Sequence, residues 1–247
     1  MLSFVRILPI ALTVALFASQ AEAGDFSGWG AIVVAGDDHA HSGAISPVFD
    51  NARRDLAAAL AKLGVAPGNI LQFSVQPGQF PAERVEQSDP GTVASRLWDL
   101  SNRTSAGCFL YFTSHGSPDG IVLGDQTFSP AKMKQIVANA CDDRPTVVVV
   151  SACYSGVFVP ALAAPNRLVL TAARPDRTSF GCGESDRYTF FDSCFLQSLQ
   201  ANRDFPDLAQ AVRACVAARE KKEQVEYPSE PQLAVGQLAA RDLPHWK

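Results

Sequence analysis

The sequence predicts an α/β protein in three layers, with a mostly parallel sheet of about six strands and helices on both faces. Short apolar runs rich in β-branched and aromatic residues, such as 108–113 and 147–150, recur along the chain. Such runs are typical of fully buried parallel strands. Segments with helical spacing of apolar residues separate them, and no linker or internal repeat divides the chain. This alternation predicts one sheet covered on both sides.

The first 23 residues are predicted to be a secretory signal peptide and not part of the fold. Arg6 precedes an apolar stretch from Ile7 to Ala18, and Ala21-Glu22-Ala23 supplies the small residues of a cleavage site. The apolar stretch is shorter than the roughly 18 residues that a membrane span needs. We therefore expect residues 24–247 to form a single domain that is periplasmic or secreted, without stable membrane insertion.

Charge and cysteine content narrow the function classes further. The formal net charge of −4 gives no reason to expect nucleic acid or an anionic membrane as a partner. In an exported protein, six cysteines invite a disulfide interpretation. Cys108 stands at the start of one strand and Cys141 before another, so a 108–141 bridge is one compatible pairing. Cys182, Cys194 and Cys215 cannot be assigned. Their spacing lacks a CxxC pair and nearby His ligands, so a structural zinc is not expected. No other metal or cofactor is expected for the function inferred below.

The first half of the chain is predicted to hold three strands and two helices. Apolar runs predict strands over 29–35, 69–74 and 108–113, and helical spacing predicts helices over 49–63 and 92–101. Gly64 ends the first helix. The polar loop 36–47 follows the first strand, and the segment 75–92 is expected to be a loop. Loops at the carboxyl ends of strands often carry functional residues.

The second half continues the alternation. A small hairpin over 121–128 turns at Gly124-Asp125, and Ser129-Pro130 begins a helix as N-cap and first residue. Further elements are predicted in order: strands 147–150 and 167–172, a polar loop 174–188, helices near 190–200 and 206–222, and an edge strand at 231–235. The connection 117–145 has room for a crossover helix, and a right-handed crossover makes the strands before and after it parallel.

Two reactive residues follow buried strands at their carboxyl ends. His115 comes after strand 108–113, and Cys153 comes after strand 147–150, so both are expected at one edge of the sheet. In open α/β folds, active sites lie at the edge formed by the carboxyl ends of the strands. A thiol beside an imidazole forms a nucleophile–base pair. The imidazolium, and a helix predicted to start within 154–163, would both favour the attacking thiolate. The backbone N–H groups of Gly116 and Cys153 are the expected donors to an oxyanion.

Each of these residues also has an ordinary structural explanation. Free Cys is among the most buried residue types, and a lone His is more often a satisfied structural residue than a base. The joint pattern favours function because both residues end their strands and both have small neighbours. Cys108 begins its strand, at the opposite edge, and is expected to be structural. His39 and His41 are expected in a solvated loop.

Four segments in order along the chain carry a family resemblance. They are W-G-A-I-V-V-A-G-D-D (29–38), F-L-Y-F-T-S-H-G followed by G-I-V-L (109–123), S-A-C-Y-S-G (151–156) and T-A-A-R-P-D-R-T-S-F (171–180). They resemble the opening strand, the His motif, the Glu-Ala-Cys-Glu-Ser-Gly nucleophile motif and the pocket segment of the legumain-type cysteine peptidases. These form peptidase family C13, in the caspase-like clan. The long carboxyl-terminal pro-domain of the eukaryotic relatives is missing, so the chain is similar to a short, bacterial-type form.

The resemblance implies a caspase–hemoglobinase-like fold and hydrolysis of peptide bonds through a Cys–His dyad and an acyl-enzyme. By this resemblance Cys153 is the nucleophile, His115 is the base and later the acid, and Gly116 is an oxyanion donor. Asp38 stands where the family has an Asn that helps to orient the His, which implies the same role here.

The specificity pocket matches the family only in part. Ser179, with Thr178 beside it, fits the pocket segment, but Ser151 replaces an acidic residue and the loop 37–48 contains no Arg. A third, acidic position falls at Phe191 or Asp192. Ser151, Thr178, Ser179 and Asp192 are therefore the expected substrate-binding residues, and the residue preferred at the cleaved bond stays open.

The expected function is a secreted cysteine endopeptidase that acts on peptide or protein substrates. Two alternatives remain at this stage. A peptide ligase or transamidase would use the same acyl-enzyme with a different acceptor, and a peptide-binding module would keep the fold without catalysis.

Overall fold

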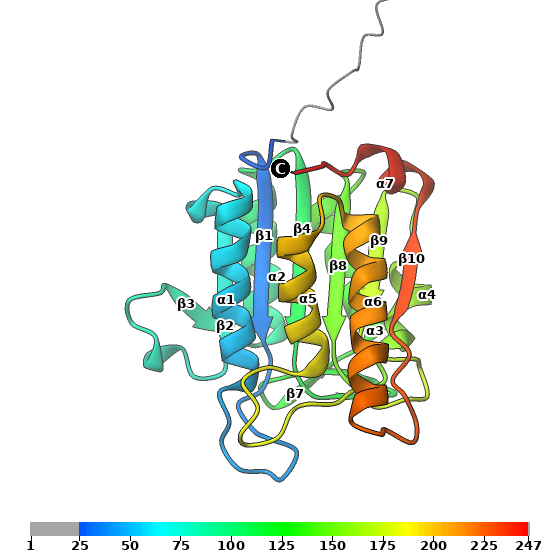
Figure 1. The fold of residues 1–247 in the computed structure, drawn as a ribbon. Coiled ribbons are helices and arrows are strands. Elements are labelled where there is room, and N and C mark those ends of the chain that lie inside the picture. The colour runs from blue at the N-terminus through cyan, green and yellow to red at the C-terminus, as the bar shows by residue number, and fades with distance from the viewer. Residues whose placement is uncertain (1–24, 247) are drawn as a thin grey trace, which may run out of the picture.

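The computed structural model describes residues 25–246; the predicted signal peptide, 1–23, lies outside the described residues. A seven-stranded sheet with the order β10-β9-β8-β4-β1-β2-β3 forms the centre (Figure 1). Its strands are β1 (Trp29–Ala35), β2 (Ile70–Ser74), β3 (Val85–Gln87), β4 (Gly107–Thr113), β8 (Thr146–Ser151), β9 (Arg167–Thr171) and β10 (Gln232–Val235). All neighbours pair in parallel except β10, which is antiparallel to β9. The predicted fold class is confirmed.

Helices cover both faces of the sheet, as Figure 1 shows. One face carries α1 (Val48–Leu63), α5 (Phe190–Ala201) and α6 (Phe205–Lys222), and the other carries α2 (Pro90–Ser101), α3 (Pro130–Cys141) and α4 (Val159–Leu162). A short α7 (Gln237–Asp242) follows β10. No helix within residues 25–246 combines the length and apolar character of a membrane span.

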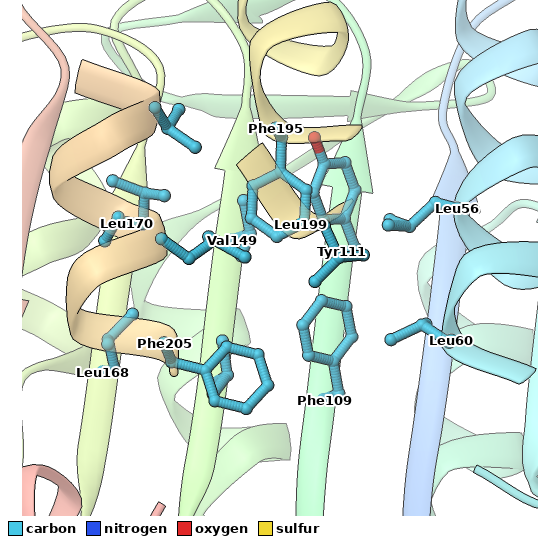
Figure 2. Close-up of a cluster of buried hydrophobic side chains, with 14 of the residues drawn as sticks. Leu56, Leu60, Phe109, Tyr111, Val149, Leu168, Leu170, Phe195, Leu199 and Phe205 are labelled. Atoms are coloured by element: carbon cyan, nitrogen blue, oxygen red, sulfur yellow. The ribbon is translucent and has the colours of Figure 1, made fainter. Parts of the chain in front are cut away.

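The alternation of side chains along the central strands builds two cores. In β4, Phe109 and Tyr111 face α1 and α5, whereas Leu110 and Phe112 face α2 and α3. Figure 2 shows the first core, where Phe195 and Leu199 of α5 and Leu56 and Leu60 of α1 surround the Phe109 and Tyr111 rings. Full burial of a side chain of this size stabilises the fold by about 1.5–3 kcal/mol. The two cores therefore hold the central strands as a rigid support for the loops that follow them.

A small second sheet follows β4 directly. It contains β5 (Gly116–Ser117), β6 (Gly120–Leu123) and β7 (Gln126–Phe128), which confirms the predicted hairpin. Gly124 adopts the left-handed φ of 63° that the tight turn between β6 and β7 requires. The Val122 N–H donates to the His115 carbonyl oxygen over 3.0 Å. This sheet therefore fixes the backbone at His115 and directly after it.

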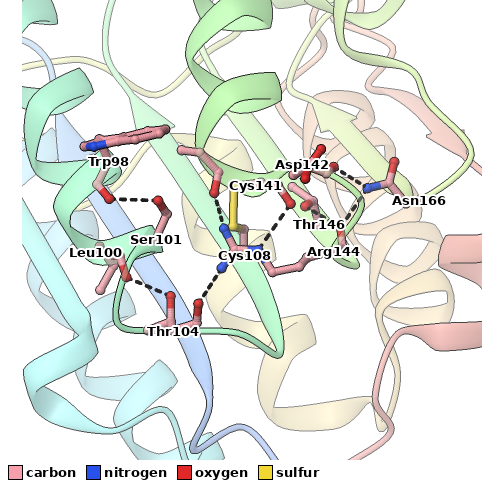
Figure 3. Close-up of a disulfide and its surroundings, with 11 residues drawn as sticks. Trp98, Leu100, Ser101, Thr104, Cys108, Cys141, Asp142, Arg144, Thr146 and Asn166 are labelled. Carbon is pink, nitrogen blue, oxygen red and sulfur yellow. Dashed lines mark hydrogen bonds between the residues drawn. A yellow bond between two sulfur atoms is a disulfide. The ribbon is translucent and has the colours of Figure 1, made fainter.

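Two disulfides brace the helices. Cys108 at the start of β4 bonds to Cys141 at the end of α3, which confirms the pairing that the sequence allowed (Figure 3). Nearby, the Arg144 guanidinium donates to the Thr104 carbonyl oxygen over 2.7 Å. The second disulfide, Cys194–Cys215, joins α5 to α6. Among the described residues, the free cysteines are Cys153 and Cys182.

The segment after Cys153 differs from the prediction. A helix was expected within 154–163, but the chain forms a 3₁₀ turn, η3 (Ser155–Phe158), and then only the four-residue α4. Tyr154 takes a left-handed conformation with φ of 58°, which a regular helix start does not allow. The 3₁₀ turns η1 (Pro67–Asn69) and η2 (Pro77–Gln79) lie in connections. The expected stabilisation of the thiolate by a helix terminus therefore lacks the helix that it requires.

Candidate active site

The pairing of β4 with β8 brings His115 and Cys153 to one edge of the sheet. Thr113 is the register partner of Ser151, and each stands two residues before the candidate catalytic residue on its own strand. The ladder continues beyond the strands, because the Ser114 N–H donates to the Ser151 carbonyl oxygen over 3.1 Å.

Gly116 lies directly against the backbone of Cys153. A Cβ atom at position 116 would overlap the Cys153 carbonyl oxygen, so only glycine allows this approach. The two segments that the sequence predicted to form the site are therefore in contact.

Backbone and aromatic contacts hold the His115 ring on two sides. Its Nε2 lies 3.0 Å from the carbonyl oxygen of His39, in the loop after β1. Because a carbonyl can only accept, Nε2 carries a proton, and in a neutral imidazole Nδ1 is then the acceptor atom. The Phe49 ring of α1 packs edge-on against the imidazole, with 5.2 Å between ring centres. This orientation would leave Nδ1 as the atom of a neutral His115 that can accept a proton.

The Cys153 thiol is half-buried and contacts the loop that follows β9. The Ser179 N–H donates to Sγ over 3.3 Å, and the Ser179 carbonyl and hydroxyl oxygens both lie 3.6 Å from Sγ. Within residues 25–246, no hydrogen bond joins the thiol directly to the imidazole. Catalytic hydrogen bonds are often long before substrate binds, so the two groups share the edge in an open arrangement.

Two backbone N–H groups at the contact between Gly116 and Cys153 are free of backbone acceptors among the described residues. Because Val122 donates to the His115 carbonyl, Gly116 and Ile121 form the non-hydrogen-bonded kind of antiparallel pair, and the Gly116 N–H lies outside the ladder. The Cys153 N–H has no backbone acceptor in the described part of the chain. The next N–H, of Tyr154, donates to the Arg177 carbonyl oxygen over 2.8 Å. The N–H groups of Gly116 and Cys153 can therefore bind an oxyanion.

Among the described residues, the Asp38 side chain forms no hydrogen bond or ion pair with His115. Its carboxylate lies 3.0 Å from Nδ1 of His39, and the Asp37 carboxylate lies 2.8 Å from the same atom. The hydrogen bond that Nδ1 of His39 donates to the Asp37 carboxylate is the main cause that raises the pKa of His39. The expected orienting role of the Asp38 side chain is therefore filled by a different group, the backbone carbonyl of His39.

Asp37, Asp38 and His39 form the one group of potential metal ligands found among the described residues. One ligand atom each from Asp37, Asp38 and His39 lies within 4.8 Å of the others. The group is partly exposed, and its imidazole is already paired with the two carboxylates. It therefore gives no independent indication of a bound ion.

The expected substrate-binding residues divide into two groups. Thr178 is exposed and Ser179 is half-buried against the sulfur, so both can meet a substrate. Ser151 is buried, and its hydroxyl lies 3.4 Å from that of Thr189. Asp192 is only 1% exposed and accepts hydrogen bonds from the Tyr111 and Thr113 hydroxyls, each over 2.7 Å. This placement closes Asp192 off from a substrate, contrary to its expected role.

Two loops meet around this edge, 36–47 and 172–189, as seen at the bottom of Figure 1. The His41 N–H donates to the Cys182 carbonyl oxygen over 3.0 Å, and the Ser42 hydroxyl donates to Glu184 over 2.6 Å. Cys182 packs against the small cluster of Ala35, Val48 and Phe49, and burial raises the pKa of its thiol. Cys182 is therefore less reactive than a free, exposed cysteine.

Sequence reasoning missed three contributors to the site. The His39 carbonyl has no side-chain signature, because every residue offers one. The Ser179 N–H is likewise a backbone group, although the residue itself was singled out. Thr189 had a detectable signal, since a Thr three residues before Asp192 is a typical N-cap, and its hydroxyl accepts from the Asp192 N–H over 3.0 Å.

Comparisons with known proteins identify the fold and the family of this chain. Caspase-1 from Spodoptera frugiperda has a similar structure, with a TM-score of 0.62 over 93% of this chain and 94% of that chain at 14% identity. This likeness shows the caspase fold. No curated protein matches the sequence. The model of the Peptidase C13 family matches residues 88–239, which is more than half of the chain and includes His115 and Cys153. The chain therefore belongs to the peptidase C13 family of cysteine peptidases.

Proposed function

We propose that this protein is an exported, legumain-like cysteine endopeptidase that cleaves peptide bonds through an acyl-enzyme intermediate. The single observation that carries the proposal is the register of β4 with β8, which sets His115 and Cys153 at one edge with Gly116 against the Cys153 backbone. The family match supports the same chemistry.

The geometry supports the following steps. Nδ1 of His115 takes the thiol proton of Cys153, and the thiolate attacks the carbonyl carbon of the cleaved bond. The N–H groups of Gly116 and Cys153 bind the oxyanion. His115 then gives its proton to the departing amine, and the acyl group remains on sulfur. A water molecule, deprotonated by His115, hydrolyses the thioester and frees the thiol.

The test is the loss of peptide cleavage in Cys153→Ala and in His115→Ala. Both variants are expected to lose all measurable cleavage of a diverse peptide library while circular dichroism and melting temperature stay near those of the wild type. Cys182→Ala is the matched control, because it removes the other free thiol and is expected to retain cleavage. Wild-type turnover by purified Cys153→Ala would overturn the mechanism.

Transfer to an amine uses the same acyl-enzyme, so the library experiment is repeated with an added amine nucleophile. Hydrolysis predicts that mass spectrometry finds mainly products with a free carboxyl group. Mainly amine-joined products would instead assign the protein as a ligase or transamidase. Absence of any Cys153-dependent product would favour a binding module.

Export is supported by the leader sequence and by the two disulfides, which form and persist in oxidising compartments. The expected mature chain begins at Gly24. Mass spectrometry of the protein recovered from the periplasmic or secreted fraction of an expression host should therefore give the mass of residues 24–247. Recovery of the uncleaved chain in the cytosol would contradict it.

A further inference from the structure

A buried carboxylate lies beneath the candidate site without reaching it. Asp192 is the third residue of α5, and both of its oxygens are used: Oδ1 accepts from the Tyr111 hydroxyl and Oδ2 from the Thr113 hydroxyl, each over 2.7 Å. Figure 2 shows the Tyr111 hydroxyl directed away from Phe109, along β4. Burying a carboxylate costs folding free energy unless its hydrogen bonds are complete. A buried carboxylate next to the candidate site therefore suggests a role beyond stability.

The first turn of α5 contacts the ends of both strands that carry the dyad. Asp192 binds Thr113, two residues before His115, and the Thr189 hydroxyl lies 3.4 Å from that of Ser151, two residues before Cys153. Thr189 and Asp192 are themselves joined as N-cap and N3 over 3.0 Å. One helical turn therefore holds the two strand ends.

The same turn also fixes the loop that contacts the sulfur. The Phe190 N–H donates to the Phe180 carbonyl oxygen over 2.9 Å, and a Cβ at Gly181 would collide with the Phe190 backbone and ring. Phe180 is the neighbour of Ser179, whose N–H donates to Sγ of Cys153. The loop that contains Ser179, the end of β4 and the end of β8 are therefore all held by the first turn of α5.

We propose that Asp192 is a positioning residue, which sets His115, Cys153 and Ser179 in their working arrangement without touching the substrate. This inference rests on the proposed peptidase function. Asp192 is therefore expected to affect kcat and not to bind the substrate. A misplacement of about 1 Å in reacting groups can cost about 100-fold in rate, so a mobile α5 start is expected to lower kcat.

The test compares three variants in α5. Asp192→Ala leaves the two hydroxyls without an acceptor, and is expected to lower kcat by about tenfold or more with KM changed less than about twofold. Asp192→Asn keeps the shape and an acceptor oxygen, and is expected to restore most of kcat. Leu199→Ala is the control: it weakens the same helix at its other end, where Leu199 is buried, and is expected to keep kcat.

Two further measurements keep the proposal falsifiable if Asp192→Ala does not fold. Thr113→Val and Tyr111→Phe each remove one donor to the carboxylate, and Thr113→Val should lower kcat more because Thr113 is closer to His115 along β4. The rate of iodoacetamide alkylation at Cys153, mapped by peptide mass spectrometry, should fall in the same order.

Several outcomes would overturn the proposal. One is an unchanged kcat in Asp192→Ala, and another is an equal loss of kcat in Leu199→Ala. A rise in KM alone in Asp192→Ala would indicate direct substrate contact and would also overturn it. If Asp192→Ala does not fold, equal kcat values and equal alkylation rates in Thr113→Val and Tyr111→Phe would do the same. A wild-type protein without Cys153-dependent cleavage refutes the proposed function instead. The alkylation rates would still report whether Asp192 positions the thiol.

Discussion

At the scale of single residues, Gly116 tests the oxyanion site most directly. Gly116→Ala would push the new methyl group into the Cys153 carbonyl oxygen and displace the Gly116 N–H. Loss of one oxyanion donor typically lowers kcat by about 100- to 1000-fold, and we expect a loss of that order. The measurement is steady-state cleavage of the best library peptide.

Gly78→Ala serves as the control for this substitution. A Cβ at position 78 would meet open space, so the variant should cleave at the wild-type rate. Full activity of Gly116→Ala would show that the N–H of residue 116 is not a donor.

Asp192 gives a second prediction at this scale, concerning stability against pH. Burial raises the pKa of its carboxyl above the ordinary 3.8, so the folded state holds the proton more tightly than the unfolded chain. Between those two pKa values the folded state binds more protons, and the group's contribution to the free energy of unfolding falls as pH rises. Asp192→Asn cannot titrate and loses this slope.

The free energy of unfolding of the aspartate form, minus that of Asp192→Asn, should therefore decrease as pH rises above about 4. Urea titrations from about pH 4 to pH 8 measure this difference. Both forms should carry Cys153→Ala, which prevents self-cleavage. A difference that stays constant or grows with pH would contradict the prediction.

At the scale of elements, the Cys194–Cys215 disulfide is expected to stabilise the pair of helices α5 and α6. It closes a loop with a sequence separation of 21, for which the chain-entropy model gives about 3 kcal/mol. Replacing both cysteines with Ser should lower the free energy of unfolding by about that amount, measured with urea.

Reductant provides the control for this prediction. It should destabilise the double variant less than the wild type, because only Cys108–Cys141 remains to be reduced. Equal sensitivity of both proteins would mean that the second disulfide contributes nothing.

The central elements could be predicted from sequence because their signals are local. Val147 to Val150 form an unbroken apolar run, and Ser129-Pro130 is a helix start that needs no neighbour. β3 could not be predicted, since Val85–Gln87 becomes a strand only by pairing with β2. The left-handed φ of Tyr154 could not be predicted, because this conformation is rare for residues other than Gly, Asn and Asp.

The candidate site divides in the same way. His115 and Cys153 could be predicted because a reactive residue at a strand end is visible in the sequence, and parallel pairing brings such ends together. The bond from His115 to the His39 carbonyl depends on loop geometry alone. The burial of Asp192 depends on how α5 docks onto β4, which no local pattern encodes.

At the scale of the whole molecule, an aromatic cluster joins the two ends of the described chain. The Trp246 ring lies 4.9 Å from that of Phe205 and 6.2 Å from that of Phe26. Trp246→Ala should lower the free energy of unfolding by about 3–5 kcal/mol, the typical cost of removing a buried aromatic side chain. Activity per folded molecule should not change, because β1 begins beside this cluster and the site lies at the other end of the strands.

Trp98→Ala is the matched control for this prediction, since Trp98 on α2 is 52% exposed. Thermal denaturation should show a change of less than about 0.5 kcal/mol for this variant. Similar melting temperatures for both variants would contradict a stabilising role for the cluster.

The aromatic cluster has a practical consequence for handling the protein. Because Phe26 and Trp246 meet at the edge where β1 begins, away from the strand ends that carry His115 and Cys153, a partner protein fused to either end would extend from the opposite edge of the sheet. The protein could be attached to a bead or a cell surface through its C-terminal end. The edge of the sheet that carries the candidate site would then face the solution and stay accessible to peptides.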